Sequence, residues 1–221
     1  MANAMAPTTP CHVETPAEER LSSITHGIGA VLSVVGFAAL LAMAFLRGTP
    51  RHVITLGIYG ASLLALYLTS TCYHACREGR VKRRLQVVDH IAIYCLISGT
   101  YTPFLLVSLG GAWGWSLFCI LWGLSAIGAV LKLFYTDQFD FASTMIYLAM
   151  GWIGVVAAKP FLEHLPGGAI AWMVAGGLAY TGGVAFYLWE RLPFNHAIWH
   201  LFVMAGSACH FFGILFYVLP R

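Results

Sequence analysis

The sequence predicts an all-α membrane protein built as one bundle of seven transmembrane helices. Of its 221 residues, 59% are apolar and only 10% are charged, whereas charged residues make up about 25% of an ordinary soluble domain. The apolar residues are gathered in long stretches of the length that crosses a bilayer, which is about 20 helical residues. Basic residues interleaved with aromatic ones, which would indicate nucleic-acid binding, are not found. Membrane lipid is therefore the expected partner, with no nucleic acid and no soluble protein inferred.

The first helix is predicted by its capping signals. Thr15 suits the N-cap, Pro16 suits the first helical position, and Glu18 stands where a capping box needs it. Residues 1–14 are expected to form a disordered tail, which leaves residues 15–221 as the transmembrane domain. The first apolar run is too long for a cleavable signal, so this span is expected to be retained. The seven predicted spans cover residues 21–46, 52–76, 85–108, 113–135, 141–158, 168–189 and 194–219.

Small residues and prolines add detail to this bundle. Many of the 23 glycines lie inside the spans, where they allow helices to approach closely. Pro103 predicts a kink near the far end of the third span. The six cysteines include no CxxC pair, so no disulfide framework is expected. Cys72 and Cys76 are interpreted as small buried fillers.

The distribution of Lys and Arg between the loops predicts the orientation, because cytoplasmic loops are enriched in both. A cytoplasmic N-terminus places eight basic residues inside and four outside. The inner set is Arg20, Arg77, Arg80, Lys82, Arg83, Arg84, Lys132 and Arg191, and the outer set is Arg47, Arg51, Lys159 and Arg221. We therefore expect the N-terminus inside and the C-terminus outside, in a plasma membrane of bacterial inner-membrane type.

Histidines at the predicted inner ends of the spans form a candidate metal site. His196 and His200 are four residues apart and share one helix face. His74 ends the second span, Ser70 lies one turn before it, and Asp89 begins the third span from the same side. Ionisable residues inside membrane spans usually serve a function. The alternatives are interfacial histidines, or a polar cluster that pins the helices together.

Three imidazoles with an open fourth position are typical of catalytic zinc. We assign His74, His196 and His200 as the metal ligands. Asp89 is predicted to hold the water activated at the metal or to orient a ligand histidine, and Ser70 to add an outer hydrogen bond.

Four other polar residues have weaker signals. His26, near the inner end of the first span, could support the site or be only interfacial. His210 lies about three turns beyond His200 and is interpreted as a core histidine with its hydrogen bonds satisfied. Glu18 and Glu19 suit the first turn of a helix as well as they suit a site.

Several motifs together resemble the hemolysin III family, which belongs with the progestin and adipoQ receptors, including the adiponectin receptors, and more distantly with alkaline ceramidases. The resemblance covers about residues 17–219 and is carried by residues 19–29, 70–74, 89–94, 99–103, 151–152 and 196–200. It implies a seven-helix bundle with a zinc ion held by His74, His196 and His200, supported by Ser70 and Asp89. In the receptor and ceramidase relatives such a site is linked to hydrolysis of ceramide-type amides. Without long tails, hormone recognition is not expected here.

Three functions remain to be weighed. The first is a zinc-dependent intramembrane hydrolase of lipid amides or esters, and the second is a membrane sensor in which zinc is structural. The third is the pore-forming activity that the family name implies. A secreted pore-former must stay soluble before insertion, which seven retained apolar spans do not allow. The sequence therefore favours the first two.

Overall fold

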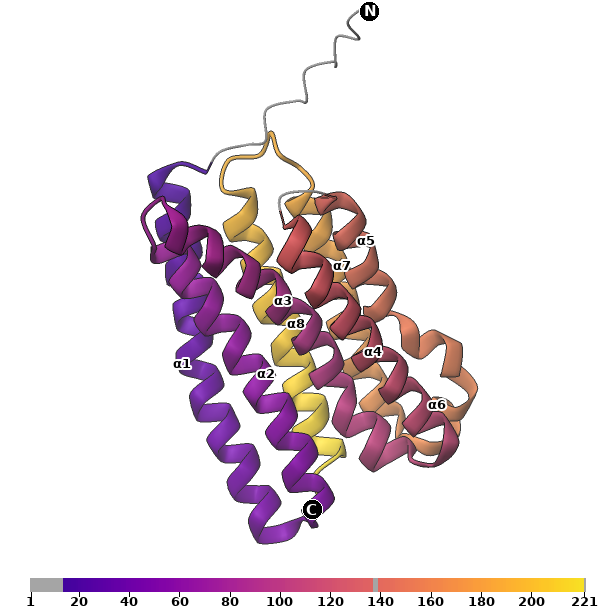
Figure 1. Ribbon diagram of the computed structural model, residues 1–221. Coiled ribbons are helices and arrows are strands. Elements are labelled where there is room, and N and C mark those ends of the chain that lie inside the picture. The colour runs from indigo at the N-terminus through magenta and orange to yellow at the C-terminus, as the bar shows by residue number, and fades with distance from the viewer. Residues whose placement is uncertain (1–13, 137–138, 221) are drawn as a thin grey trace, which may run out of the picture.

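The computed structural model describes residues 14–136 and 139–220, and all regular structure within these ranges is helical (Figure 1). The helices in chain order are α1 (Pro16–Arg47), α2 (Pro50–Ala75), α3 (Arg80–Pro103), η1 (Phe104–Leu109), α4 (Gly111–Tyr135), α5 (Asp140–Gly151), η2 (Ile153–Ala157), α6 (Ala158–His164), α7 (Gly167–Tyr187) and α8 (Asn195–Tyr217).

Seven helical segments of the described chain are long and apolar enough to cross a membrane, which confirms the predicted class. The third segment joins α3 to η1, and the fifth joins α5 to η2 and α6. The predicted capping box is also present: the Thr15 hydroxyl accepts from the Glu18 amide, and the Glu18 carboxylate accepts from the Thr15 amide. The basic segment before the third span was predicted as loop through Arg84, but α3 begins at Arg80.

The third span changes from α-helix to π-helix at Pro103, the residue where the sequence predicted a kink. Its ring nitrogen has no hydrogen to donate to the preceding turn. The chain continues past it as the wider π-helix η1 up to Leu109. Helix distortions of this kind are accommodated within membrane bundles by neighbouring groups.

The fifth span is broken, whereas the sequence predicted one helix over 141–158. Helix α5 ends at Gly151 and the chain tightens into the 3₁₀ turn η2 before α6. Pro160 opposes an α-helix at the junction of η2 and α6, because its ring crowds the Val156 carbonyl four residues earlier and it has no amide hydrogen. The Tyr101 hydroxyl binds backbone groups on both sides of the break: it donates to the Gly151 carbonyl at 2.5 Å and accepts from the Gly154 amide at 3.3 Å.

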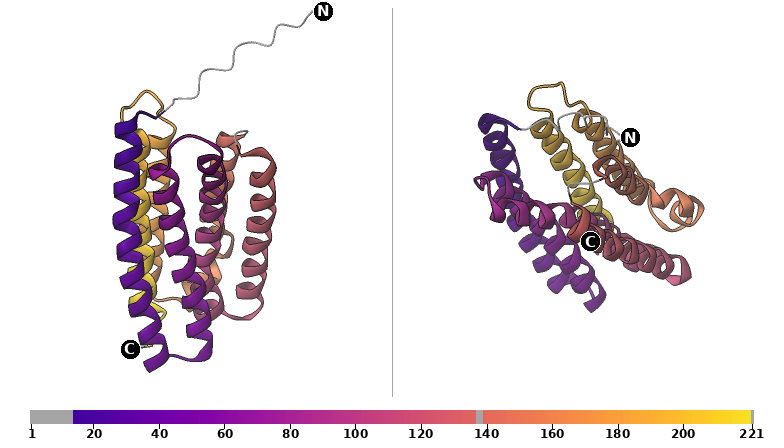
Figure 2. Two further views of the ribbon diagram at one scale, coloured as in Figure 1. Left: turned by 60° about the vertical axis from the view of Figure 1, so that its left-hand side comes forward. Right: turned by 45° about the horizontal axis from the view of Figure 1, so that its top comes forward.

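Helix α8 lies inside the bundle, between α1 on one side and α7 on the other, and packs against both (Figure 2). The outer faces are apolar: Val31, Leu32 and Val35 of α1 are exposed, as lipid-facing residues should be. Inward faces are richer in polar groups. Ser70 and His74 of α2 are buried there, while Cys72 is exposed because it lies half a turn away, so its interpretation as a buried filler was wrong.

The predicted site residues lie at one end of the bundle. We call it the N-terminal end, because α1 begins there; α2 ends there, and α3 and α8 begin there (Figure 1). His74 is in the last turn of α2, and His196 and His200 occupy the first turns of α8. The start of α1, the neighbouring ends of α2 and α3, and the start of α8 thus meet at one end of the bundle.

Candidate metal centre

Three histidines meet at the N-terminal end of the bundle. The ring centroids of His74 and His196 are 4.8 Å apart, those of His74 and His200 are 5.0 Å apart, and those of His196 and His200 are 4.7 Å apart. Each offers one ring nitrogen, and the three nitrogens lie within 4.8 Å of one another. The group could therefore hold a metal ion. The structure brings together the three residues that the sequence analysis assigned as ligands.

Carboxylates accept hydrogen bonds from the Nδ1 atoms of two of these rings. His74 Nδ1 lies 2.9 Å from Glu19 Oε2, and His196 Nδ1 lies 2.9 Å from Glu14 Oε1. An ionised carboxylate only accepts, so each Nδ1 carries the hydrogen. Nε2 is then the nitrogen left for a metal, and in His74 this atom is buried without a hydrogen-bond partner among the described residues. Such carboxylate–histidine pairs are the usual outer partners of metal ligands.

The third ring is oriented by main chain. His200 Nδ1 donates to the Ser22 carbonyl oxygen at 3.1 Å and lies 3.2 Å from the Thr25 hydroxyl. His200 is 2% exposed, so its orientation is fixed by α1 on one side and the cluster on the other. Its Nε2 is again the nitrogen available to a metal. In all three rings Nδ1 is engaged in a hydrogen bond, which leaves Nε2 as the nitrogen for a metal.

The start of α8 is held in place by α1. Phe194 precedes the helix in the left-handed region, with φ of 59°, a conformation that is strained for a bulky residue. Its amide donates to Glu18 Oε1 at 2.9 Å, while the other Glu18 oxygen closes the capping box. Glu18 thus joins the first turns of α1 and α8 and sets the position of His196.

His26 is buried next to these three histidines rather than exposed at the membrane interface. Its ring stacks on His200 with the centroids 3.4 Å apart and the planes 8° apart. His26 Nδ1 lies 2.7 Å from the Ser70 hydroxyl. Ser70 therefore contacts the cluster through His26, as an outer hydrogen-bonding group.

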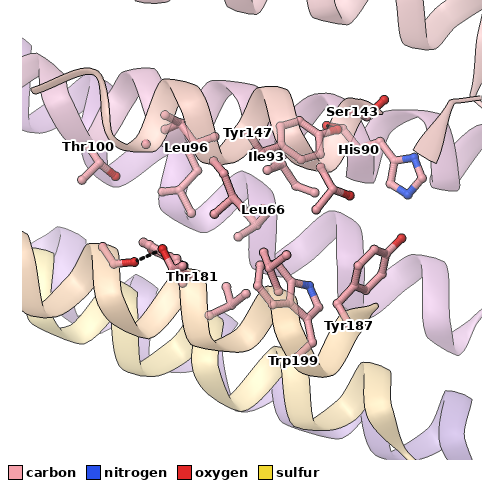
Figure 3. Close-up of a pocket in the computed structure, with 18 of the residues that line it drawn as sticks. Leu66, His90, Ile93, Leu96, Thr100, Ser143, Tyr147, Thr181, Tyr187 and Trp199 are labelled. Carbon is pink, nitrogen blue, oxygen red and sulfur yellow. Dashed lines mark hydrogen bonds between the residues drawn. The ribbon is translucent and has the colours of Figure 1, made fainter. Parts of the chain in front are cut away.

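A cavity extends from this cluster between the helices. The space open to the centre of a water-sized sphere is about 140 Å³, whereas a single water needs roughly 10–15 Å³ by that measure. Figure 3 shows Leu66, Ile93 and Leu96 pointing into it, with His90 and Tyr187 toward one end and Thr100 and Thr181 toward the other. The cavity is therefore an apolar channel with polar groups at both ends.

Asp89, His196 and His200 all line this cavity, as do Ser70 and His26. Asp89 is buried, with 7% of its surface exposed. Asp89, predicted to hold the activated water or to orient a ligand, thus opens onto the same cavity as two of the three predicted ligands, His196 and His200.

Two residues differ from their interpretation in the sequence. His210 also lines the cavity and stacks on Tyr180, but its buried Nδ1 has no hydrogen-bond partner among the described residues. It is therefore not the satisfied core histidine that was expected. Glu14 was placed in the tail, yet it contacts His196; residues 1–13 lie outside the described part of the chain. No periodicity could have revealed Glu14, because it precedes the first helix.

The Glu14 carboxylate is ionised in this environment. Burial by itself raises its pKa, but the hydrogen bond with His196 and the positive charge of Lys82 are among the interactions that lower it, and the pKa lies below its ordinary value. Glu14 therefore acts as an acceptor for the ring hydrogen of His196.

Comparisons with known proteins identify the family of the chain. A family model described as "Haemolysin-III related" matches residues 15–211. "Hemolysin-3" of Bacillus cereus is 49% identical over 203 residues, which cover 92% of this chain and 93% of that protein. "Hemolysin-3 homolog" of Bacillus subtilis (strain 168) is 44% identical, over 92% of this chain and 95% of its own. The human "Monocyte to macrophage differentiation factor" is 28% identical, over 98% of this chain and 91% of its own. The chain is therefore a member of the haemolysin-III-related family of multi-pass membrane proteins.

Proposed function

We propose that this protein is a zinc-dependent intramembrane hydrolase that cleaves an amide or ester bond of an acyl lipid. One observation carries the proposal: two of the three clustered histidines, His196 and His200, line an apolar cavity that also contains a buried carboxylate, Asp89. A metal, a proton acceptor and room for a hydrocarbon chain are the components that such a reaction requires.

The donor set fits zinc. Three neutral imidazoles that leave one position open are found at catalytic zinc sites, whereas magnesium and calcium prefer oxygen ligands. The buried, unpartnered Nε2 of His74 supports the fit, because an unpaired polar atom is costly in a bundle interior. A zinc ion bound there would polarise a substrate carbonyl and lower the pKa of water toward about 7.

The side chains around the cluster would transfer protons, support a ligand histidine and hold the acyl chain. Asp89 would accept a proton from the attacking water and return it to the leaving amine or alcohol. Ser70 and His26 form a hydrogen-bonded pair, and the His26 ring would support His200 by stacking on it. The acyl chain would lie among Leu66, Ile93 and Leu96, which keep water from the bond being cleaved.

The substrate would come sideways from the bilayer, because the helices that surround the cavity are lipid-facing on their outer sides. We place the protein in the plasma membrane with the N-terminal end of the bundle toward the cytoplasm. That orientation follows the excess of Lys and Arg in the loops at this end.

The test is fatty-acid release by the purified protein in lipid nanodiscs, with a panel of N-acyl and O-acyl lipids. Asp89→Asn should retain zinc but release fatty acid roughly 100-fold more slowly, since a general base contributes at least this factor. Glu163→Gln is the matched control, because Glu163 is 56% exposed and pairs only loosely with Lys159 at 3.9 Å. Wild-type release no faster than in protein-free nanodiscs would refute the hydrolase, and equal release by wild type and Asp89→Asn would refute Asp89 as its proton acceptor.

A sensor is the second candidate, favoured by the placement of the ligands on two different helices. A metal ion would tie His74 of α2 to His196 and His200 of α8, which otherwise packs on α1 and α7. Zinc occupancy could then shift the packing of α2 against α8. The sensor would be supported by a zinc-dependent change in the distance between labels on these helices, together with no fatty-acid release.

A further inference from the structure

We propose that Glu14 and Glu19 are positioning residues of the metal centre, each fixing the ring of one ligand histidine. The inference rests on the metal site of the proposed function but does not depend on hydrolysis. Each carboxylate binds the Nδ1 atom of one ligand ring, with 2.9 Å between carboxylate oxygen and Nδ1 in each pair. They would set the tautomer and direct Nε2 toward the metal.

Glu19 is itself held in place. Its Oε1 is 2.5 Å from the ammonium of Lys82, which also donates to the Cys76 carbonyl at 3.4 Å. Lys82 in turn lies over the ring of Tyr73, 4.8 Å from its centroid. Glu19 therefore has one oxygen bonded to a cation on α3 and the other to His74 on α2. The His74 side chain is fully buried, so this bond is shielded from water.

Glu14 spans the two helices that carry the ligands. Its Oε1 is bonded to His196 of α8, and its Oε2 lies 3.7 Å from His74 Nδ1 of α2. That second oxygen is buried without a hydrogen-bond partner among the described residues, and the side chain is only 15% exposed. A negative charge held between two ligand rings increases the basicity of both and favours their binding to a cation.

A second metal ion is the competing interpretation, because Glu14, Glu19 and His74 also offer closely spaced ligand atoms. Two contacts oppose it. His74 Nδ1 already donates to Glu19, so it has no lone pair for a second ion. The ammonium of Lys82 already bonds to Glu19, and a further cation at this point would be repelled. The geometry therefore favours orientation of the ligands.

The experiment measures zinc affinity by competition with a fluorescent chelator, at fixed pH, on the full chain in nanodiscs. Glu19→Ala and Glu14→Ala should each weaken zinc binding by roughly 10–100-fold, the usual effect of losing an outer partner. Glu19→Gln and Glu14→Gln should lose less, because an amide oxygen still accepts the ring hydrogen. Glu163→Gln, an exposed carboxylate on α6, should leave the affinity unchanged.

Thermal unfolding of the zinc-free proteins separates positioning from folding. We expect the glutamine variants to unfold within a few degrees of the zinc-free wild type while their zinc affinity differs. Unchanged zinc affinity in all four variants would overturn the proposal. It would also be overturned if the wild type bound two zinc ions and the variants lost one without weakening the other.

The two proposals fail differently. A wild type that binds no zinc would remove the metal centre, and with it both proposals. A wild type that binds zinc and depends on Glu14 and Glu19, yet releases no fatty acid, would remove the hydrolase and support the positioning role.

Discussion

Gly29→Ala should destabilise the bundle through a contact that leads directly to the metal centre. Gly29 of α1 packs on the ring of Tyr67 in α2, and a Cβ added at Gly29 would lie 2.5 Å from Tyr67 Cδ1. Tyr67 is 3% exposed, so its ring has little room to move away. The same ring meets His26 edge-on with 5.0 Å between centroids, and His26 stacks on His200. A displacement of Tyr67 is therefore transmitted to a ligand.

The expected magnitude follows from the size of the clash. Ordinary van der Waals contact begins at 3.4 Å, so α1 or the ring must shift by nearly an ångström. Overpacking of this kind costs about 1–3 kcal/mol. Alanine also favours helix over glycine by up to about 1 kcal/mol, which partly masks the cost. Gly57→Ala isolates that gain, because nothing lies within 4 Å of a Cβ built at Gly57.

The measured quantity is the difference in thermal unfolding between Gly29→Ala and Gly57→Ala in nanodiscs. Both variants gain the same helix propensity of alanine over glycine, so their difference reports the overpacking cost alone. That cost of about 1–3 kcal/mol corresponds to an unfolding temperature lower by roughly 2–12 °C for a chain of this size. The comparison is repeated with Tyr67→Leu in both proteins, where the clash is relieved and the difference should shrink. Equal unfolding temperatures of the two alanine variants, or a penalty that survives Tyr67→Leu unchanged, would refute the reasoning.

Two further predictions concern orientation and the first helix. A reporter fused after Gly79 should be cytoplasmic and one after Arg221 external, because the basic residues are concentrated at the N-terminal end; a cytoplasmic C-terminus would contradict this orientation. Thr15→Ala should lower the free energy of unfolding by about 1 kcal/mol, since its hydroxyl caps the Glu18 amide. Thermal or denaturant unfolding measures the loss, and an unchanged stability would show that the cap contributes nothing.

The sequence predicts the number and approximate limits of the spans because hydropathy follows the free energy of transferring side chains into lipid. Hydropathy carries no information on whether the helix within a span is continuous. The break after Gly151 leaves the apolar character of the fifth span intact, so a hydropathy argument cannot detect it. The available signal is Pro160, but the group that stabilises the break, the Tyr101 hydroxyl, comes from another span. Such a partner can be identified only once the helices are assembled.

The same distinction explains what could be predicted of the site. His196 and His200 are four residues apart, so helical geometry alone places them on one face. His74 could be added because it lies at the same predicted depth. The roles of Glu14 and Glu19 could not be predicted, because glutamates near a helix start equally suit the helix dipole. Their function depends on distances to α2 and α8, which are properties of the tertiary structure.

The segment at the beginning of α1 also holds the start of α8 and the rings of the ligand histidines in place. Glu18 ties Phe194 to α1 and so fixes the first turn of α8. Glu14 and Glu19, on either side of it in the sequence, hold the rings of His196 and His74. The Ser22 carbonyl, one turn further along, holds His200. Each of the three ligand histidines is thus oriented by a segment of nine residues, Glu14 to Ser22. Because α2 and α8 supply the ligands and the segment at the start of α1 supplies their partners, packing of α1 against both helices completes the site.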